Sequence, residues 1–327
     1  SVPVAGPYAT GGFRISNPAL LATQNVATGW GEVSRAGVPS RVVYTGELDT
    51  DDVTEIWVTS VDAAPTAPLP FKINPPQQGN AGAVTWQACA GVSTTRIIFV
   101  GDFGANNFLE VYSADSQGSA VGALASVAST TGSVSLPVIC VGTQDKIAFY
   151  GPLVAATRDD VYASNINGGQ APVLLTPTTD PAAAAQMFPG SFGGQSLTSD
   201  GQRLVWIGTY EGTNAGRQNL WSAPLTGPGL LVNLRPGTSS GNGDVLDFKL
   251  SPSGGALVYR SFQESPSEYL YSSGIRPMDP PLANPRLNPN KASGRVALGT
   301  SYRYMTDNIV IFIGNFNPSA TRFDREL

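Results

Sequence analysis

A short pattern recurs six times along the chain, at intervals of about 50 to 57 residues, and it limits the fold more than any other feature. Each copy is a burst of apolar residues with an aromatic residue at its fourth position, as in RVVYTG from Arg41 or RLVWIG from Arg203. The six aromatic residues are Tyr44, Phe99, Phe149, Trp206, Tyr259 and Phe312. Similarity at a fixed period of this length is typical of repeat proteins, in which each copy is one supersecondary unit.

Other elements keep a fixed distance from these bursts. Some twelve to fifteen residues after each of the first five aromatics comes a second burst with its own aromatic: Trp57, Tyr112, Tyr162, Trp221 and Tyr271. Gly, Asn, Asp and Ser fill the interval, as in a hairpin loop. A third element follows, such as PFKINPP from Pro70, and a fourth precedes each first burst, such as AVTWQACA from Ala83. Four short strands per period predict an antiparallel blade, whose regularly placed aromatics pack between neighbouring sheets.

These repeats predict an all-β fold: a six-bladed β-propeller with four-stranded antiparallel blades, forming a single domain over residues 1–327. The predicted blades span about 28–76, 82–128, 132–178, 190–238, 244–290 and 294–327. The segment at about 11–18, GGFRISNP, resembles LPFKINPP from Leu69. We therefore expect this N-terminal strand to join the C-terminal blade and close the ring, which removes an unpaired strand edge. The long segment 176–194 contains PAAAAQM, for which we expect a single helical turn.

Two blades carry a turn motif as well. The stretches LTSDGQRLVW from Leu197 and LSPSGGALVY from Leu250 resemble the Ser-Pro-Asp-Gly signature of TolB-like six-bladed propellers, the WD40-like repeats of bacterial exported proteins. In the other four blades this turn is replaced by different sequences. Asp or Ser followed by Gly makes the tight turn between the first two strands of a blade. The resemblance implies an exported propeller that binds other proteins.

Composition excludes several chemistries. The chain has no histidine, so no Ser-His-Asp triad, Cys-His pair or histidine metal site is possible. No G-x-S-x-G motif is present. A net charge of −5 argues against nucleic acid as a partner. No run of about eighteen apolar residues occurs, so we expect no membrane span. The chain is therefore predicted not to be an enzyme, with a glycosidase or lyase that uses carboxylates as the remaining alternative.

Two small groups of residues are candidate sites. The acidic segment GELDTDDVTE, Gly46 to Glu55, holds Asp49, Asp51 and Glu55, whose oxygens suit Ca²⁺ if they converge, although an acidic hairpin tip is also compatible with simple solvation. Cys89 and Cys140 occupy nearly the same place in consecutive repeats, so a disulfide between neighbouring blades is expected, with two buried thiols as the alternative. No catalytic residue and no cofactor other than this possible Ca²⁺ is predicted.

The functional expectation follows from the scaffold. The chain begins SVPVAG, without an initiator Met, and is poor in charged residues, which suits a processed and exported protein found outside the cell, on its surface or in the periplasm. We expect a protein-interaction or structural assembly module that binds a protein partner or associates with itself. The alternatives are a glycan-binding propeller, with or without Ca²⁺, and a glycosidase or lyase that works without histidine.

Overall fold

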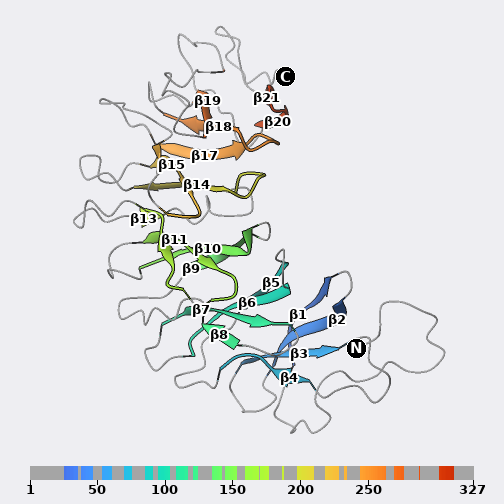
Figure 1. Cartoon of the computed structure of the whole chain (residues 1–327). Helices are drawn as coiled ribbons and strands as arrows, with labels where there is room; N and C mark the ends of the chain where they lie inside the picture. Colours follow the sequence, from blue (N-terminus) through green and yellow to red (C-terminus); the bar gives the residue numbers. More distant parts are fainter. Residues whose placement is uncertain are drawn as a thin grey trace, which may run out of the picture. The chain divides into compact units, whose positions relative to one another are not determined.

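The computed structural model (Figure 1) describes residues 26–35, 38–46, 54–60, 70–75, 85–90, 95–103, 108–116, 121–123, 135–141, 144–152, 159–168, 170–176, 186–187, 197–209, 218–227, 232–233, 244–262, 269–275, 287 and 302–312. In this part of the chain the fold is all-β, as predicted, and its regular elements are strands β1 to β21. The strands form six sheets, named the first to the sixth in chain order.

The first three sheets each have four strands, hydrogen-bonded in chain order. The first contains β1 (Val26–Arg35), β2 (Val38–Gly46), β3 (Glu55–Ser60) and β4 (Phe71–Lys72). The second contains β5 (Thr85–Ala90), β6 (Thr95–Gly101), β7 (Glu110–Asp115) and β8 (Val121–Ala123). The third contains β9 (Ser135–Val141), β10 (Lys146–Gly151), β11 (Asp160–Asn165) and β12 (Val173–Leu174).

The fourth sheet also has four strands, whereas three and two strands of the last two sheets fall within the described residues. The fourth contains β13 (Gln186–Met187), β14 (Arg203–Thr209), β15 (Asn219–Pro224) and β16 (Val232–Asn233). The fifth contains β17 (Val245–Leu250), β18 (Ala256–Ser261) and β19 (Tyr269–Gly274). The sixth contains β20 (Tyr302–Thr306) and β21 (Ile309–Phe312). The predicted closing strand at 11–18 lies outside the described residues.

The chain divides into two compact units. One comprises Ser1–Ser135, Gln144–Ile147 and Ser164–Pro172, and the other comprises Leu136–Thr143, Ala148–Ala163 and Val173–Leu327. The first two sheets belong to the former unit and the last three to the latter. Buried side chains of consecutive sheets pack together inside each unit, for example Val43 and Ile56 with Phe99, and Leu220 with Tyr259.

The repeated aromatics are core residues, as their register predicts. In four sheets the two aromatics of a repeat are direct cross-strand partners: Tyr44 with Trp57, Phe99 with Tyr112, Trp206 with Trp221, and Tyr259 with Tyr271. In the third sheet the rings of Phe149 and Tyr162 stack at 5.7 Å. The first five repeat aromatics are almost fully buried and Phe312 is half-buried. Such pairs contribute about 0.5–1.5 kcal/mol each beyond the burial of their area.

An arginine at the start of the second strand is anchored identically in two sheets. Arg96 donates from Nε to Ser113 Oγ (2.7 Å) and from Nη2 to Ser113 O (3.1 Å). Arg203 donates in the same way to Ser222 Oγ (2.9 Å) and Ser222 O (3.1 Å). Both side chains are buried, and burial lowers the pKa of Arg96, with the charge of Asp115 opposing this shift. The hydrogen bonds therefore compensate the removal of these cations from water.

The residues 181–185 of the PAAAAQM segment, for which a helical turn was expected, lie outside the described residues, whereas its last two residues, Gln186 and Met187, form strand β13. They pair with Thr209 and Gly208 of β14. The backbone groups of β14 thereby gain hydrogen-bond partners along the edge that faces β13.

Candidate functional site: a row of turns

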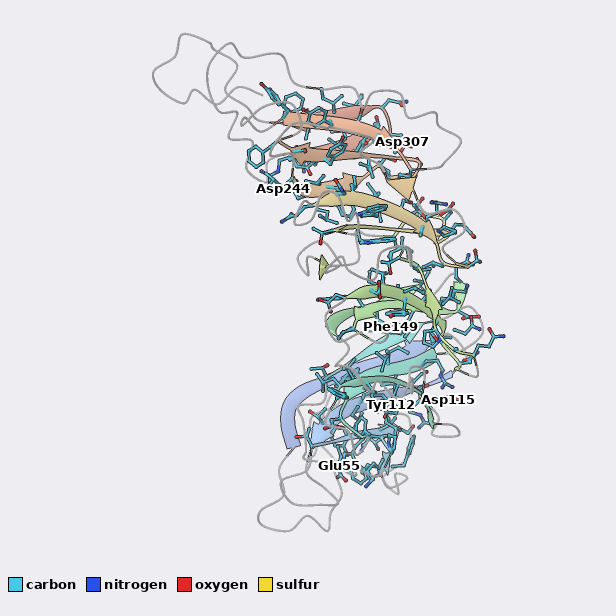
Figure 2. All side chains as sticks on the ribbon, turned by 90° about the vertical axis from the view of Figure 1, so that its left-hand side faces the viewer. Glu55, Tyr112, Asp115, Phe149, Asp244 and Asp307 are labelled. Carbon is cyan, nitrogen blue, oxygen red and sulfur yellow. The ribbon has the colours of Figure 1, made fainter. Side chains whose placement is uncertain are left out.

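Three turns between the first and second strands of successive sheets form the best-defined exposed feature of the second unit. They are residues 198–202 before β14, residues 251–255 between β17 and β18, and residues 306–308 between β20 and β21. We call these three segments together the turn row. Figure 2 labels Asp307 in the turn row and Asp244 at the opposite end of the fifth sheet.

The first two turns are built by the same hydrogen bonds. In each, the residue that begins the turn donates its amide across the hairpin: Thr198 N to Arg203 O (3.0 Å) and Ser251 N to Ala256 O (2.8 Å). The hydroxyls of Thr198 and Ser251 accept the returning amides at 3.0 and 3.2 Å. Gly201 and Gly254 then adopt φ of +68° and +72°, a conformation that other residues rarely take. The tight turn predicted from the motif is confirmed.

Direct contacts join the three turns. The Ser199 hydroxyl donates to the Ser253 carbonyl, and the Ser253 amide donates to Asp307 Oδ1 at 2.8 Å. A Cβ added to Gly254 would lie 2.6 Å from the backbone nitrogen of Ser199, so only glycine permits this approach. The hydrogen bonds from Ser253 to the Asp307 carboxylate lower the pKa of Asp307. The turn row is therefore held together by contacts among its own residues.

Exposed apolar side chains flank the last turn. Met305 is 58% exposed and Ile309 53%, and among the described residues Leu246, at 37%, is the other large hydrophobic side chain classed as exposed. Met305 lies at an irregularity in the β20–β21 pairing, and Ile309 pairs with Thr306. Two apolar side chains thus stand beside the polar turn at one hairpin tip.

A polar network supports this hairpin from the fifth sheet. Asp247 on β17 forms an ion pair with Arg260 on β18, and Tyr302 OH donates to Asp247 Oδ1 at 2.6 Å. Lys249 donates to Tyr302 O (2.6 Å) and lies 5.0 Å from the centre of the Tyr302 ring. Burial, and then the negative charge of Asp247, raise the pKa of Tyr302 well above its ordinary value. Tyr302 thus remains a neutral hydrogen-bond donor that fixes the last hairpin against the fifth sheet.

Of the three predicted Ca²⁺ ligands, Glu55 lies within the described residues. Glu55 is the first residue of β3, it is buried, and its Oε1 accepts a hydrogen bond from Lys72 Nζ at 2.9 Å. Asp49 and Asp51 lie outside the described residues. Within the described part of the chain, no group of three or more His, Cys, Asp or Glu side chains is placed to hold a metal ion. Both Cys89 and Cys140 are disulfide-bonded, and no cysteine is free.

Sequence reasoning did not predict that a set of acids would be buried. Glu55, Glu110 and Asp160 are each the first residue of the third strand of their sheet, and each is buried. The signal was present: an acid precedes the second repeat aromatic by two residues in EIW, EVY and DVY. Asp102, buried after the end of β6, has no such repeat signal.

Repeated antiparallel sheets define the chain as an all-β repeat protein. No protein-family model and no curated protein matches its sequence. The solved structures similar to it are TolB and other β-propeller proteins. They include the putative TolB from Agrobacterium tumefaciens, with 12% identity over 72% of this chain and 73% of that one and a TM-score of 0.34. The β-propeller domain of the Trilobed protease from Pyrococcus furiosus has 14% identity over 84% and 73%, with a TM-score of 0.35.

A third similar structure is prolyl oligopeptidase B from Galerina marginata, with 10% identity over 89% of this chain and a TM-score of 0.42. This chain covers 41% of that peptidase and 49% of TolB from Acinetobacter baumannii. TolB is thus among the solved structures that are similar to this chain. In the described residues, no helix is long and apolar enough to cross a membrane.

Proposed function

We propose that the chain is an exported six-bladed β-propeller that acts as a protein-interaction or structural assembly module, with the turn row as its contact surface. In this proposal the blades have the boundaries predicted from the repeats, and residues 11–18 add the outermost strand of the last blade. The disulfide supports export, because disulfides persist in oxidising compartments and are rare in the cytosol.

The observation that carries the proposal is the exposure of Met305 and Ile309 by more than half beside an ordered polar turn. Protein contact surfaces combine an apolar centre with a polar rim that supplies hydrogen bonds. Here the two apolar side chains supply the centre, and the Ser199, Ser253 and Asp307 turns supply the rim. A partner that buried both apolar side chains would remove from water the largest exposed hydrophobic groups of the described surface.

Preorganisation supports the same surface. Binding orders side chains and loops, and this ordering weakens association unless the surface is already fixed. The turn row is held by its own hydrogen bonds and by the close approach of Gly254 to Ser199. Little further ordering is therefore needed when a partner binds.

The test is a comparison of three purified proteins. The first is the natural chain, the second carries Met305→Ser and Ile309→Ser, and the third carries Leu246→Ser as the control for loss of an exposed apolar residue elsewhere. Light scattering over a concentration series measures association with a second copy. Binding of separately purified envelope proteins, identified by mass spectrometry from a co-purification, measures association with another protein.

We expect the double variant to lose the association, at least tenfold in dissociation constant, and the Leu246 control to keep it. An equal affinity for all three proteins would show that the turn row is not the contact surface. Binding of oligosaccharides by the natural chain, with no protein association at any concentration, would instead favour the glycan-binding alternative.

A further inference from the structure

The two faces of the sixth sheet differ in what covers them. One face packs against the fifth sheet through Tyr302, Tyr304, Val310 and Phe312. Side chains alternate between the two faces along a strand, so Arg303, Ile309 and Ile311 lie on the other face, which we call the outer face. Ile309 is 53% exposed, Arg303 is exposed and Ile311 is half-buried. The outer face therefore leaves apolar side chains in contact with water.

The other five sheets bury the residue that is equivalent to Ile311. Ile311 directly precedes the sixth repeat aromatic, and the residues at this place in the other sheets are at most 1% exposed: Val43, Ile98, Ala148, Val205 and Val258. Four of them belong to a buried cluster shared with the following sheet: Val43, Ala148, Val205 and Val258. Ile311 keeps an aliphatic side chain at a place that a neighbouring sheet buries elsewhere. The outer face is therefore suited to contact with another β-sheet.

The first sheet has little surface left to offer to the outer face. In each of the four contacts above, the following sheet presents the face that carries its repeat aromatics, such as Trp206 in the fourth sheet and Phe312 in the sixth. The corresponding aromatics of the first sheet, Tyr44 and Trp57, are already buried, at 2% and 8% exposed, with Val42 packed against them. The sixth sheet of a second copy, in contrast, presents an open apolar face.

The sixth-sheet hairpin carries opposite charges at its two ends. Arg303 pairs with Ile311 at the open end, whereas Asp307 lies in the turn at the tip (Figure 2). Hydrogen bonds from Ser253 lower the pKa of Asp307, so its carboxylate is ionised at neutral pH. In the described part of the chain neither Arg303 nor Asp307 forms an ion pair. If two such hairpins face each other in opposite directions, Arg303 of each copy lies near Asp307 of the other, with Ile309 between them.

We propose that two copies of the chain associate through the outer faces of their sixth sheets, about a two-fold axis that places the two hairpins antiparallel. This inference rests on the proposed function, and it names a second copy as the partner of the surface beside the turn row. A two-fold contact is self-complementary, as the apolar centre and the opposite charges of this hairpin require. One hairpin face is small compared with a standard interface of about 1,600 Å², so we expect a weak dimer.

Exchange of the two charges tests the arrangement. In a dimer of Arg303→Asp, or of Asp307→Arg, like charges meet at both ends of the contact, so we expect dimerisation at least about tenfold weaker than in the natural chain. A mixture of the two variants restores opposite charges at both ends, and its mixed dimer is expected to regain the natural affinity. Arg303→Asp mixed with the natural chain keeps one repulsive end and should stay weak. Sedimentation and native mass spectrometry measure these dimers.

Chemical cross-linking tests the same contact without changing a charge. No cysteine of the chain is free, so Ile309→Cys introduces a single thiol on the outer face. Packed sheets lie about 10 Å apart, so a bismaleimide of that length is expected to join two Ile309→Cys chains covalently. Leu246→Cys, at an exposed position of the fifth sheet, is the control and should give no covalent dimer. An Ile309→Cys thiol that does not react would show that the chain covers its own outer face, which overturns the proposal.

The results separate this inference from the proposed function. If the charge mixture does not recover affinity while Met305→Ser with Ile309→Ser still abolishes association, the contact surface stands and the antiparallel dimer is refuted. The same conclusion follows if the natural chain is monomeric at every concentration but binds another protein through Met305 and Ile309. Self-association that persists in the Met305→Ser and Ile309→Ser double variant refutes both.

Discussion

Replacing Gly254 by alanine tests whether the turn row is held together by contact between the turns. Gly254 has φ of +72°, where a residue with a Cβ is disfavoured by about 1–2 kcal/mol. The new Cβ would also lie 2.6 Å from Ser199 N and 3.1 Å from both Ser199 Oγ and Thr198 Cα. Two of these three atoms belong to the backbone, so a side-chain rotation cannot relieve the overlap and one turn must move.

The magnitude follows from what this movement breaks. The hydrogen bond from the Ser199 hydroxyl to the Ser253 carbonyl is lost, and the one from the Ser253 amide to Asp307 is weakened. Both hydrogen bonds are exposed, so each contributes to stability near the lower end of the usual range of about 0.5–1.5 kcal/mol. With the backbone strain, we expect Gly254→Ala to lower the free energy of unfolding by about 1.5–3 kcal/mol.

Gly201→Ala is the matched control. Gly201 takes φ of +68° at the equivalent place in the preceding turn, so alanine there carries the backbone strain of about 1–2 kcal/mol. Urea unfolding followed by the fluorescence of the buried Trp206 and Trp221 gives both values, with equal m-values as the check that the same transition is measured. If the two variants lose the same stability, contact between the turns contributes nothing and the argument for an ordered turn row is refuted.

Three further predictions follow from named contacts. Arg203→Met is expected to lower the free energy of unfolding, measured by thermal unfolding, by about 2–3 kcal/mol, because Ser222 Oγ and O lose a buried charged donor. A decrease below about 0.5 kcal/mol would contradict this expectation. The pKa of Asp307 is lowered in the folded state, so the Asp307 carboxylate stabilises the fold at pH values above the ordinary aspartate pKa near 4. This stabilisation is lost as the pH falls below that value. Melting temperatures between about pH 2 and 5 should show a shallower fall for Asp307→Asn, which still accepts the hydrogen bond. Reduction should add two hydrogens to the intact mass and, for a bond closing the loop from Cys89 to Cys140, should lower stability by about 4 kcal/mol.

The strand pairs were predictable because, in an antiparallel hairpin, two residues separated by a fixed number of positions lie opposite each other on neighbouring strands. An aromatic at the fourth position of one burst and another some twelve to fifteen residues later come to lie opposite each other, as Tyr44 and Trp57 do. The same geometry fixed the fourth strand: the amides of Ile73 and Leu175 donate to equivalent carbonyls, of Ile56 and Val161. The pairing of such residues can be predicted from the repeat itself, without knowing which distant residues they contact.

Features that depend on a partner from elsewhere in the chain were not predictable in this way. Strand β13 was not predicted because its two residues follow four alanines, whereas the residues with which it pairs, Gly208 and Thr209, lie in β14, further along the chain. The contact of Glu55, one of the predicted Ca²⁺ ligands, with Lys72 could not be foreseen either, because Lys72 lies on the fourth strand, seventeen residues away. Asp102 carried no signal at all, because its environment arises from the burial of one hairpin end.

Differences between repeats are therefore the informative positions in this chain. The turn motif is well formed in only two repeats, and those are the two whose turns touch through Ser199 and Gly254. The third turn of the row departs from the motif, yet it supplies Asp307, whose carboxylate completes the row at Ser253. Likewise Lys72, which pairs with Trp57 in the first sheet, is replaced at the equivalent place of the second sheet by Ala123, which pairs with Tyr112. Positions that keep their residue type from sheet to sheet form the core, and positions that change make the contacts that differ between sheets.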